Sequence, residues 1–560
     1  MDKRVLLAIT LCMVVYLVFM MLTPQPNKGK SMPQTKKEVT GQPNKIDNSK
    51  AENKEQLHQD YNLPTVELKE MTLGNDLYGA TFSNRGASLK TLILKGYKDY
   101  KKEKELILLS SAEENPAHFV LRAVGNSVDL GKVNWEIRNS DGKSIEFSCL
   151  LPNGLEIRKS FTISTNTYNI NLTLSIKNKL STPVKSTFEL TAFAGLQQDS
   201  PYREEAYLQG FIGTKPSDYA VEYVNPANIK DGVMTVKYKD TVWQGIKNRY
   251  FTGVVIPQDN SLIDSYSFNL VKEHQGIAVN NGGKDVIRNN VSCGFKTVEI
   301  EFQPGADNVY GFNIYTGPIH YSELEEQKSG LLLLLDYAGF DFIGFTILGI
   351  LNFFFNIFRN YGVAILLTTF LIRLLLFPLT KKGQVSMYKL QRIQPKLLAL
   401  KEQYKNDKQK FAQEQMRMFK EYGVNPLGGC LPMLIQLPVW FGMYSVCDIS
   451  IDFRQAHFMS WMNDLSEPDR LAQLPFSILG TSDLNLLPII MVIVSIVQML
   501  MQPASPDPQA RTQQRMMLFM WPIMGMLFYG LAAGLSLYFI TNSVLAIAEQ
   551  RIIKKYFIKA

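Results

Sequence analysis

Apolar residues are distributed very unevenly along the chain. Residues 5–22 form an uninterrupted apolar run, VLLAITLCMVVYLVFMML, directly after Lys3 and Arg4. No small-x-small cleavage site follows this run, so it predicts an uncleaved transmembrane anchor over residues 1–23 with its N-terminus inside. Residues 24–60 are rich in Pro, Asn, Lys, Gln and Glu and lack Phe, Tyr and Trp, which predicts a flexible tether.

Residues 61–320 alternate between apolar and polar positions, for example in YGATFS (78–83) and YNINLTLSIKN (168–178). A period of two is typical of strands that bury one face. Turn sequences join such runs: SDG (140–142), PNG (152–154) and NNGG (280–283). The region therefore predicts a large antiparallel β domain, a sandwich of packed sheets.

The C-terminal part contains apolar runs that are long enough to cross a bilayer. The predicted spans are 361–379, 428–447, 484–501 and the long run 516–548. As one helix the last run would be about 50 Å long, whereas the apolar core of a bilayer is about 30 Å thick. The LAAG sequence at 531–534 offers a break, so we expect two short spans of about 15 residues each.

Residues 340–358, FDFIGFTILGILNFFFNIF, are as apolar as these spans, and the charge of the neighbouring segments decides whether they cross the membrane. The segment 381–421 has eleven Lys and Arg residues against four acids, so it belongs on the cytoplasmic side. Only one crossing can then separate it from an outer β domain. We therefore assign that crossing to 361–379 and place 340–358 at the outer interface, within a connector over 321–360. The prediction is a polytopic α-helical membrane protein with six transmembrane helices, both termini cytoplasmic and the β domain outside.

The basic segment 381–422 also has a helical pattern. Apolar side chains recur at a 3-4-3-4 spacing at Leu390, Ile393, Leu397, Leu400 and Tyr404, and a second set follows at Phe411, Met418, Phe419 and Tyr422. Two narrow apolar seams of this kind predict an antiparallel helical hairpin. Its charge fits either a solvated face or a surface for an acidic partner such as lipid headgroups or ribosomal RNA.

Arg373 lies inside the first span of the C-terminal part, in TTFLIRLLLFPLT. A guanidinium at that depth costs roughly 2.5 to 3.5 kcal/mol on insertion scales. Other polar residues lie within spans: Thr369 four residues earlier, Gln436 in the next span, and Thr541 and Asn542 in the last. Because no predicted span contains an acidic residue, we expect water in a cavity open to the cytoplasm to solvate Arg373, in preference to snorkelling toward lipid.

Catalytic and metal-binding motifs are missing from the sequence. The five histidines are isolated, and neither a P-loop nor a G-x-S-x-G motif occurs. We therefore expect no enzymatic activity, no cofactor and no metal. Cys149 and Cys293 share the β domain and could pair, but two buried thiols are the favoured interpretation.

Four segments carry a specific resemblance: FLIRLLLFPLT (370–380), VNPLGGCLPMLIQLPVW (424–440), RQAHFMSWMNDLS (454–466) and GLSLYFITN (534–542). From about residue 335 onward the chain resembles the YidC/Oxa/Alb family of membrane protein insertases, in the Gram-negative form with a large periplasmic domain. The resemblance implies a groove open to the cytoplasm and to lipid, with groove residues at Arg373, Thr369, Gln436, Tyr538 and Thr541. One departure is Phe539, because the family often has two adjacent aromatic residues here of which the second is tyrosine, and this chain lacks that hydroxyl.

The implied function is the insertion and folding of newly made proteins of the bacterial inner membrane, alone or with a Sec-type translocon. Nascent membrane proteins and membrane lipids are the implied partners, with ribosome contact through 381–421 and 503–515. Two other classes remain open on the residues alone. These are a transporter that binds a small anion at Arg373, and a membrane-tethered carbohydrate-binding or carbohydrate-converting β-sandwich protein.

Overall fold

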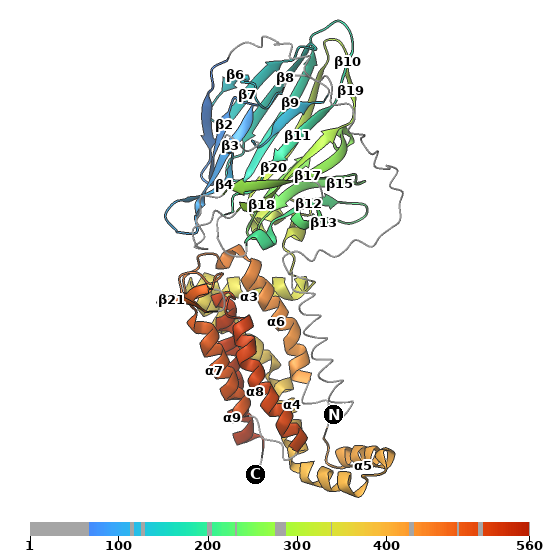
Figure 1. Ribbon diagram of the computed structural model, residues 1–560, viewed down its shortest axis with the longest axis vertical. Coiled ribbons are helices and arrows are strands. Elements are labelled where there is room, and N and C mark those ends of the chain that lie inside the picture. Colours follow the sequence, from blue (N-terminus) through green and yellow to red (C-terminus); the bar gives the residue numbers. More distant parts are fainter. Residues whose placement is uncertain are drawn as a thin grey trace, which may run out of the picture. The chain divides into compact units, whose positions relative to one another are not determined.

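The computed structural model describes residues 66–111, 117–124, 129–198, 204–229, 232–274, 287–337, 339–424, 431–478, 481–501 and 508–558 (Figure 1). The predicted anchor 1–23, the tether 24–60 and the turn 280–283 lie outside the described residues. The chain divides into two compact units, one ending at Leu335 and one beginning at Asp336. Each is described by itself.

The first unit is built from antiparallel strands. They are β1 (Glu70–Gly74), β2 (Tyr78–Ser83), β3 (Ser88–Lys98), β4 (Glu105–Ser110), β5 (Val120–Ala123), β6 (Glu136–Ser140), β7 (Ser144–Leu150), β8 (Leu155–Ile163), β9 (Asn169–Asn178), β10 (Val184–Ser186), β11 (Phe188–Phe193), β12 (Gln209–Thr214), β13 (Ala220–Val224), β14 (Val233–Val236), β15 (Thr241–Lys247), β16 (Phe251–Pro257), β17 (Ile263–His274), β18 (Ile287–Thr297), β19 (Ile300–Phe302) and β20 (Asp307–Pro318). A short helix, α2 (Tyr321–Glu326), follows them. The predicted turns at 140–142 and 152–154 join β6 to β7 and β7 to β8, with positive φ at Gly142 and Gly154.

These strands form a large sheet that packs against smaller ones (Figure 1). The nine-stranded sheet has the order β13-β12-β15-β16-β20-β9-β8-β7-β6, and the others are β14-β17-β18-β11-β5, β1-β2-β3-β4 and β10-β19. Phe161 of β8 meets Phe82 of β2 with ring centroids 4.8 Å apart, and Phe312 of β20 stacks on Phe295 of β18 at 5.4 Å. The prediction of a large β-rich domain is therefore confirmed over the described residues.

Cys149 and Cys293 do not pair in this unit. Both are free and buried. Burial raises the pKa of the Cys149 thiol to about 11 and that of Cys293 to about 12, because the apolar surroundings disfavour the thiolate. The interpretation of these residues as two buried thiols is confirmed.

The second unit is mainly helical. Its helices are α3 (Asp341–Phe358), α4 (Tyr361–Gln403), α5 (Lys408–Glu421), α6 (Leu431–Ile449), α7 (Leu486–Leu500), α8 (Pro508–Leu527) and α9 (Ala533–Tyr556), and a hairpin of β21 (Ala472–Ile478) and β22 (Thr481–Leu484) precedes α7. In Figure 1, α3 lies across the direction in which α4, α6 and α9 run. The turn from α3 to α4 is abrupt, because Arg359 has a positive φ of 53° and the Asn360 side chain caps α4 by accepting from the Val363 N–H.

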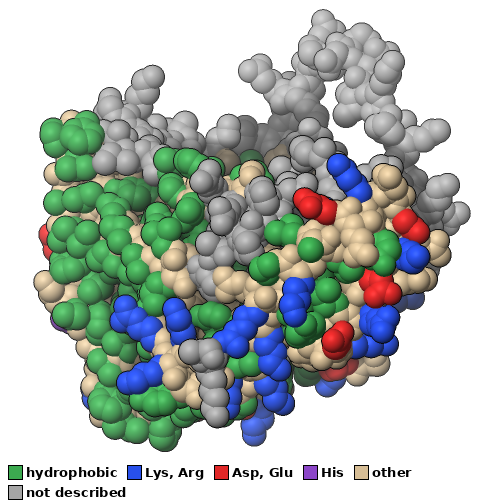
Figure 2. Space-filling view, turned by 90° about the horizontal axis from the view of Figure 1, so that it is seen from below, with side chains coloured by type: hydrophobic (Ala, Val, Ile, Leu, Met, Phe, Trp, Pro, Cys, Tyr) green, Lys and Arg blue, Asp and Glu red, His purple; other side chains and the backbone are tan. Residues whose placement is uncertain are grey.

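Large apolar side chains are exposed along these helices. Examples are Phe353 of α3, Leu375 of α4, Leu500 of α7 and Phe519 of α8, each more than half exposed. Among the described residues, α3 and α4 are long and apolar enough to cross a membrane, and α7 is a shorter apolar helix. Figure 2 shows apolar side chains gathered over the left part of the view, and Lys and Arg side chains along its lower middle and over its right part, where Asp and Glu also lie.

The two final helices are longer than the two apolar spans of about 15 residues that the sequence predicts within them. The break falls where expected, between Leu527 and Ala533, but α8 has 20 residues and α9 has 24. The helix α9 continues beyond the apolar run because nothing in residues 549–556 breaks it and Lys554 and Lys555 in its last turn suit the negative end of the helix dipole. Its last buried turns therefore carry polar residues, among them Glu549.

The basic segment forms a helical hairpin, and its first helix is the continuation of α4. Ile393, Phe419 and Val424 form a small buried core, with Leu390, Leu397 and Met418 packed against it. These residues include members of both predicted seams. The fusion of span and hairpin into one helix was not predicted, and it passes through Pro378 and Pro395.

Candidate functional site

Arg373 of α4 is held by α9 through all three of its guanidinium nitrogens. Its Nε donates to Asn542 Oδ1 at 2.7 Å, and its Nη2 donates to the Asn542 carbonyl oxygen at 3.1 Å. Its Nη1 donates to Glu549 Oε2 at 3.2 Å. The Arg373 and Glu549 side chains are 13% and 11% exposed, so this ion pair is largely shielded from water. A planar fork with charge-assisted bonds of this kind fixes the position of the cation.

The expectation that Arg373 has no acidic partner is therefore wrong. It depended on ending the last span at residue 548, one position before Glu549. Because α9 continues to Tyr556, the carboxylate reaches the guanidinium from the adjacent helix. A buried guanidinium without a counter-charge is costly, and Glu549 supplies that charge.

A second polar contact joins α6 to α9. The Gln436 side-chain Nε2 donates to the Tyr538 hydroxyl at 2.7 Å. Tyr538 is 1% exposed, so its hydroxyl is satisfied inside the helical unit. The family resemblance implied both as groove residues, and they meet across helices that are about 100 positions apart in the chain.

The two threonines of the predicted set behave differently. Thr369 Oγ1 donates to the Ile365 carbonyl at 2.7 Å, and Thr541 Oγ1 donates to the Leu537 carbonyl at 2.7 Å. Each hydroxyl therefore bonds back to its own helix, four residues earlier, as is common for threonine in apolar helices. Thr369 is buried and Thr541 is half-buried. The structure brings Arg373 to α9 and Gln436 to Tyr538, but shows no side-chain bond from either threonine to those groups.

Sequence reasoning noted Asn542 as polar but assigned it no contact, and it missed Glu549. The signal was available in their spacing, since residues seven apart lie on the same face of a helix. Asn542 and Glu549 therefore form one polar stripe along α9, and Arg373 bridges its two members.

A network of buried polar groups fixes where α7 and α9 begin. Asp469 Oδ2 accepts from the backbone N–H groups of Leu486 and Leu487, at 2.9 and 3.2 Å, and so caps α7. The Ala533 N–H donates to the Glu467 carbonyl at 2.8 Å at the start of α9. These contacts hold the first residues of α7 and α9 to the loop that contains Glu467 and Asp469.

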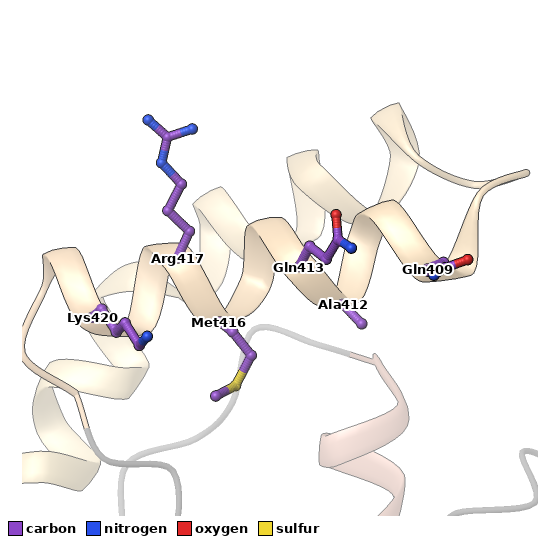
Figure 3. Close-up of a pocket in the computed structure, with 6 residues that line it drawn as sticks. All are labelled: Gln409, Ala412, Gln413, Met416, Arg417 and Lys420. Carbon is purple, nitrogen blue, oxygen red and sulfur yellow. The ribbon is translucent and has the colours of Figure 1, made fainter.

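The outer face of α5 is a separate basic surface. A shallow depression of about 580 Å³ runs along it, lined by Gln409, Ala412, Gln413, Met416, Arg417 and Lys420 (Figure 3). All six are exposed, and Phe419 points to the opposite side of α5, into the hairpin core. In Figure 3, Met416 and Arg417 point to opposite sides of the helix. Exposed side chains of α5 therefore include both apolar and cationic groups.

Comparisons with known proteins cover 99% of the chain. A family model described as "60Kd inner membrane protein" matches residues 353–560, and one described as "YidC periplasmic domain" matches residues 70–348. The membrane protein insertase YidC of Syntrophus aciditrophicus (strain SB) is 30% identical, over 99% of this chain and 100% of that protein. The protein of the same name from Pelobacter propionicus is 29% identical, over 99% of each chain.

Two solved structures are similar at a low level. One is described as an active YidC insertase with the first transmembrane domain resolved, at 17% identity, 88% of this chain, 94% of that chain and a TM-score of 0.31. The other is a galactose mutarotase related enzyme from Lactobacillus acidophilus, at 11% identity, 44% of this chain, 97% of that chain and a TM-score of 0.31.

The β-rich unit, the apolar helices and these full-length relatives together define an inner-membrane protein insertase with a periplasmic domain. Its substrates are newly made membrane proteins, and its relatives are insertases rather than enzymes. The chain belongs to the YidC family of membrane protein insertases. Family membership decides against the anion transporter and the carbohydrate-binding protein that the residues alone left open.

Proposed function

We propose that a newly made membrane segment enters the helical unit beside Arg373, at a hydrophilic site formed by α4, α6 and α9. The observation that carries this proposal is the Arg373 guanidinium, which lies in the apolar part of α4 and is bound by Asn542 and Glu549 of α9. Polar groups at such depth are costly in a bilayer, and they are typical of substrate pathways. We call the polar strip the set formed by Arg373, Asn542, Glu549, Gln436 and Tyr538. Thr369 and Thr541 belong to the same helices, four residues before Arg373 and three residues after Tyr538.

The site lowers the cost of moving a polar tail through the bilayer. A short outer tail of the substrate loses its water on entering lipid, which costs several kcal/mol for each unpaired polar group. Side chains that offer hydrogen bonds at that depth replace part of this hydration. The apolar part of the substrate then passes to lipid along the exposed apolar faces of the helices, where methionines such as Met520 and Met526 adapt to varied partners.

The topology that fits this mechanism has six spans with both termini in the cytoplasm. The anchor 1–23 and the helices α4, α6, α7, α8 and α9 cross, while α3 lies in the outer interface. Charge supports this arrangement, since 381–421 is strongly basic and the loop 448–483 contains six acids against two bases. The orientation of α3 across α4 and α6 in Figure 1 is consistent with it.

The partners proposed for the cytoplasmic side follow from the same charge. The segments 381–421 and 503–515 would contact ribosomal RNA or anionic lipid headgroups, with Arg417 and Lys420 exposed on α5. Handover from a Sec-type translocon is the proposed route for larger substrates, and unaided insertion the route for short-tailed ones.

Insertion into liposomes that contain only this protein tests the proposal. For a membrane protein with a short polar outer tail, Arg373→Ala should slow insertion by roughly tenfold, equivalent to about 1.4 kcal/mol. Arg373→Lys should recover part of the loss, because an ammonium cannot make the three fixed contacts of the fork. Arg138→Ala, which removes an exposed arginine of the β unit, is the control. Equal rates for all four proteins would remove the site from the mechanism.

A further inference from the structure

Glu549 is an acidic residue in an uncommon place. It is buried in α9 with 8% of its surface exposed, and its carboxylate contacts the guanidinium of a different helix. Acids with so little access to water are rare unless they are paired. The presence of this carboxylate changes the charge of the site, because the pair Arg373–Glu549 is neutral where Arg373 alone would be a cation.

The contacts of Arg373 divide unequally between two residues of α9. Asn542 engages Nε and Nη2, and one of these bonds is to its backbone carbonyl. Glu549 engages Nη1 alone, two helical turns further along, or about 10 Å at 1.5 Å per residue. Arg373 would therefore remain anchored on Asn542 if Glu549 released it, with Nη1 left free to bind another acceptor.

We propose that Glu549 is a specificity-determining residue that occupies Nη1 of Arg373 until an acidic group of the entering segment displaces it. The proposal rests on the function proposed above and names the chemistry that its site prefers. Replacing one carboxylate by another leaves the guanidinium neutralised throughout. A tail without an acid cannot make this exchange, and it passes with the ion pair intact.

The surroundings of Glu549 allow its release. It is followed by Arg551, Lys554 and Lys555, which are all exposed at the end of α9. A displaced carboxylate that turns toward this end would meet cations and solvent, so its desolvation cost falls as it leaves. In the resting state the same carboxylate competes with acidic tails for Arg373, and Glu549 therefore moderates their entry.

Two substrates that differ only in the outer tail, with Asp in one and Asn in the other, test the inference in the liposome assay. Glu549→Gln retains the size of the side chain and removes its charge. We expect the ratio of insertion rates, Asp tail over Asn tail, to rise roughly three- to tenfold, because an unneutralised cation attracts an acidic tail without a competitor. Glu136→Gln is the matched control, since Glu136 is ion-paired with Arg138 on the surface of the β unit.

A purely structural role for the ion pair predicts other results. In that case Glu549→Gln slows both substrates equally and leaves the ratio unchanged, which would overturn the inference.

The exchanged variant Arg373→Glu with Glu549→Arg separates the two cases again. If the ion pair discriminates between tails by their charge, the exchanged variant should lose the preference for Asp tails. If the exchanged variant inserts both substrates at the rates of the parent, the ion pair only holds α4 against α9. Failure of the parent to insert either substrate would instead contradict the proposed function itself, and the inference with it.

Discussion

Arg373 and Lys159 are cations that are largely shielded from water, and they are stabilised in different ways. Arg373 has a carboxylate and an amide oxygen as partners, whereas Lys159 of β8 has only backbone carbonyls among its hydrogen-bond acceptors in the described structure. Lys159 is fully buried, and its Nζ donates to the carbonyls of Ala87 at 2.5 Å, Gly86 at 3.4 Å, and Phe119. It also lies over the Trp135 ring, 5.7 Å from its centroid.

The three acceptors of Lys159 share an uncommon backbone conformation. Gly86, Ala87 and Phe119 have φ values of 69°, 45° and 62°, which is the left-handed region that residues with a Cβ rarely adopt. By donating to these carbonyls, Lys159 holds two segments against β8, one with Gly86 and Ala87 and one with Phe119. Its role is structural, and burial lowers the pKa of Lys159 to about 7 because the apolar surroundings disfavour its charged form.

This pKa predicts how the stability of the β unit depends on pH. In the unfolded chain a lysine titrates near 10.4, so between about pH 7 and pH 10 the unfolded state binds more protons than the folded state. Stability should therefore rise with pH over this window, by at most about 1.4 kcal/mol per pH unit. Urea unfolding at pH 7 and pH 9, followed by tryptophan fluorescence, measures the effect.

Lys159→Met should abolish that rise and lower stability at pH 9 by about 2 to 4 kcal/mol, because buried carbonyls lose their donor. Lys90→Met, at an exposed lysine of β3, is the control. A parent protein whose stability is the same at both pH values would contradict this explanation.

At the scale of elements, the continuity of α4 links the proposed site to the cytoplasmic hairpin. One helix contains Arg373 and, 20 residues later, the hairpin residue Ile393. If the hairpin moves and α4 bends, we expect the bend at Pro378 or Pro395, because each proline lacks the N–H that would complete the backbone hydrogen bonds of the helix.

The hairpin depends on a very small core, which makes it sensitive to a single substitution. Phe419→Ala removes the largest member of the group Ile393, Phe419 and Val424, and such changes cost about 3 to 5 kcal/mol in well-packed cores. We expect α5 to detach from α4, with hydrogen exchange of the α5 amides in the full-length protein accelerated by at least roughly tenfold. Met416→Ala, on the exposed face of the same helix, should leave exchange unchanged. Equal exchange in both variants would show that this core does not hold the hairpin.

At the scale of the whole molecule, local pattern predicted the two units well. Strands such as β2 and β9 follow from strict alternation, and the turns at Gly142 and Gly154 follow from residues that tolerate positive φ. Helices α6 and α7 follow from apolar runs of suitable length. The break between α8 and α9 follows from the LAAG sequence.

Contacts between distant parts of the chain could not be predicted in the same way. The pair Arg373–Glu549 joins residues 176 positions apart, and Glu549 lies just beyond the apolar run by which the span was defined. Hydropathy ends a span at the first charged residue, but a helix ends where its backbone bonds or its packing end. Lys159 was missed for a related reason, since alternation predicts which face is buried but does not reveal a buried cation among apolar neighbours.

Newly made membrane segments are proposed to pass beside α4, α6 and α9. A photo-crosslinking amino acid in place of Gln436 tests it most directly, because that side chain lies within the polar strip next to Tyr538. The control position is Phe353, which is 61% exposed on the apolar face of α3. With ribosome-bound nascent chains of a short-tailed membrane protein, we expect the outer tail to crosslink from position 436 and not from position 353. Efficient insertion with no crosslink from position 436, or with equal crosslinks from both positions, would contradict the account.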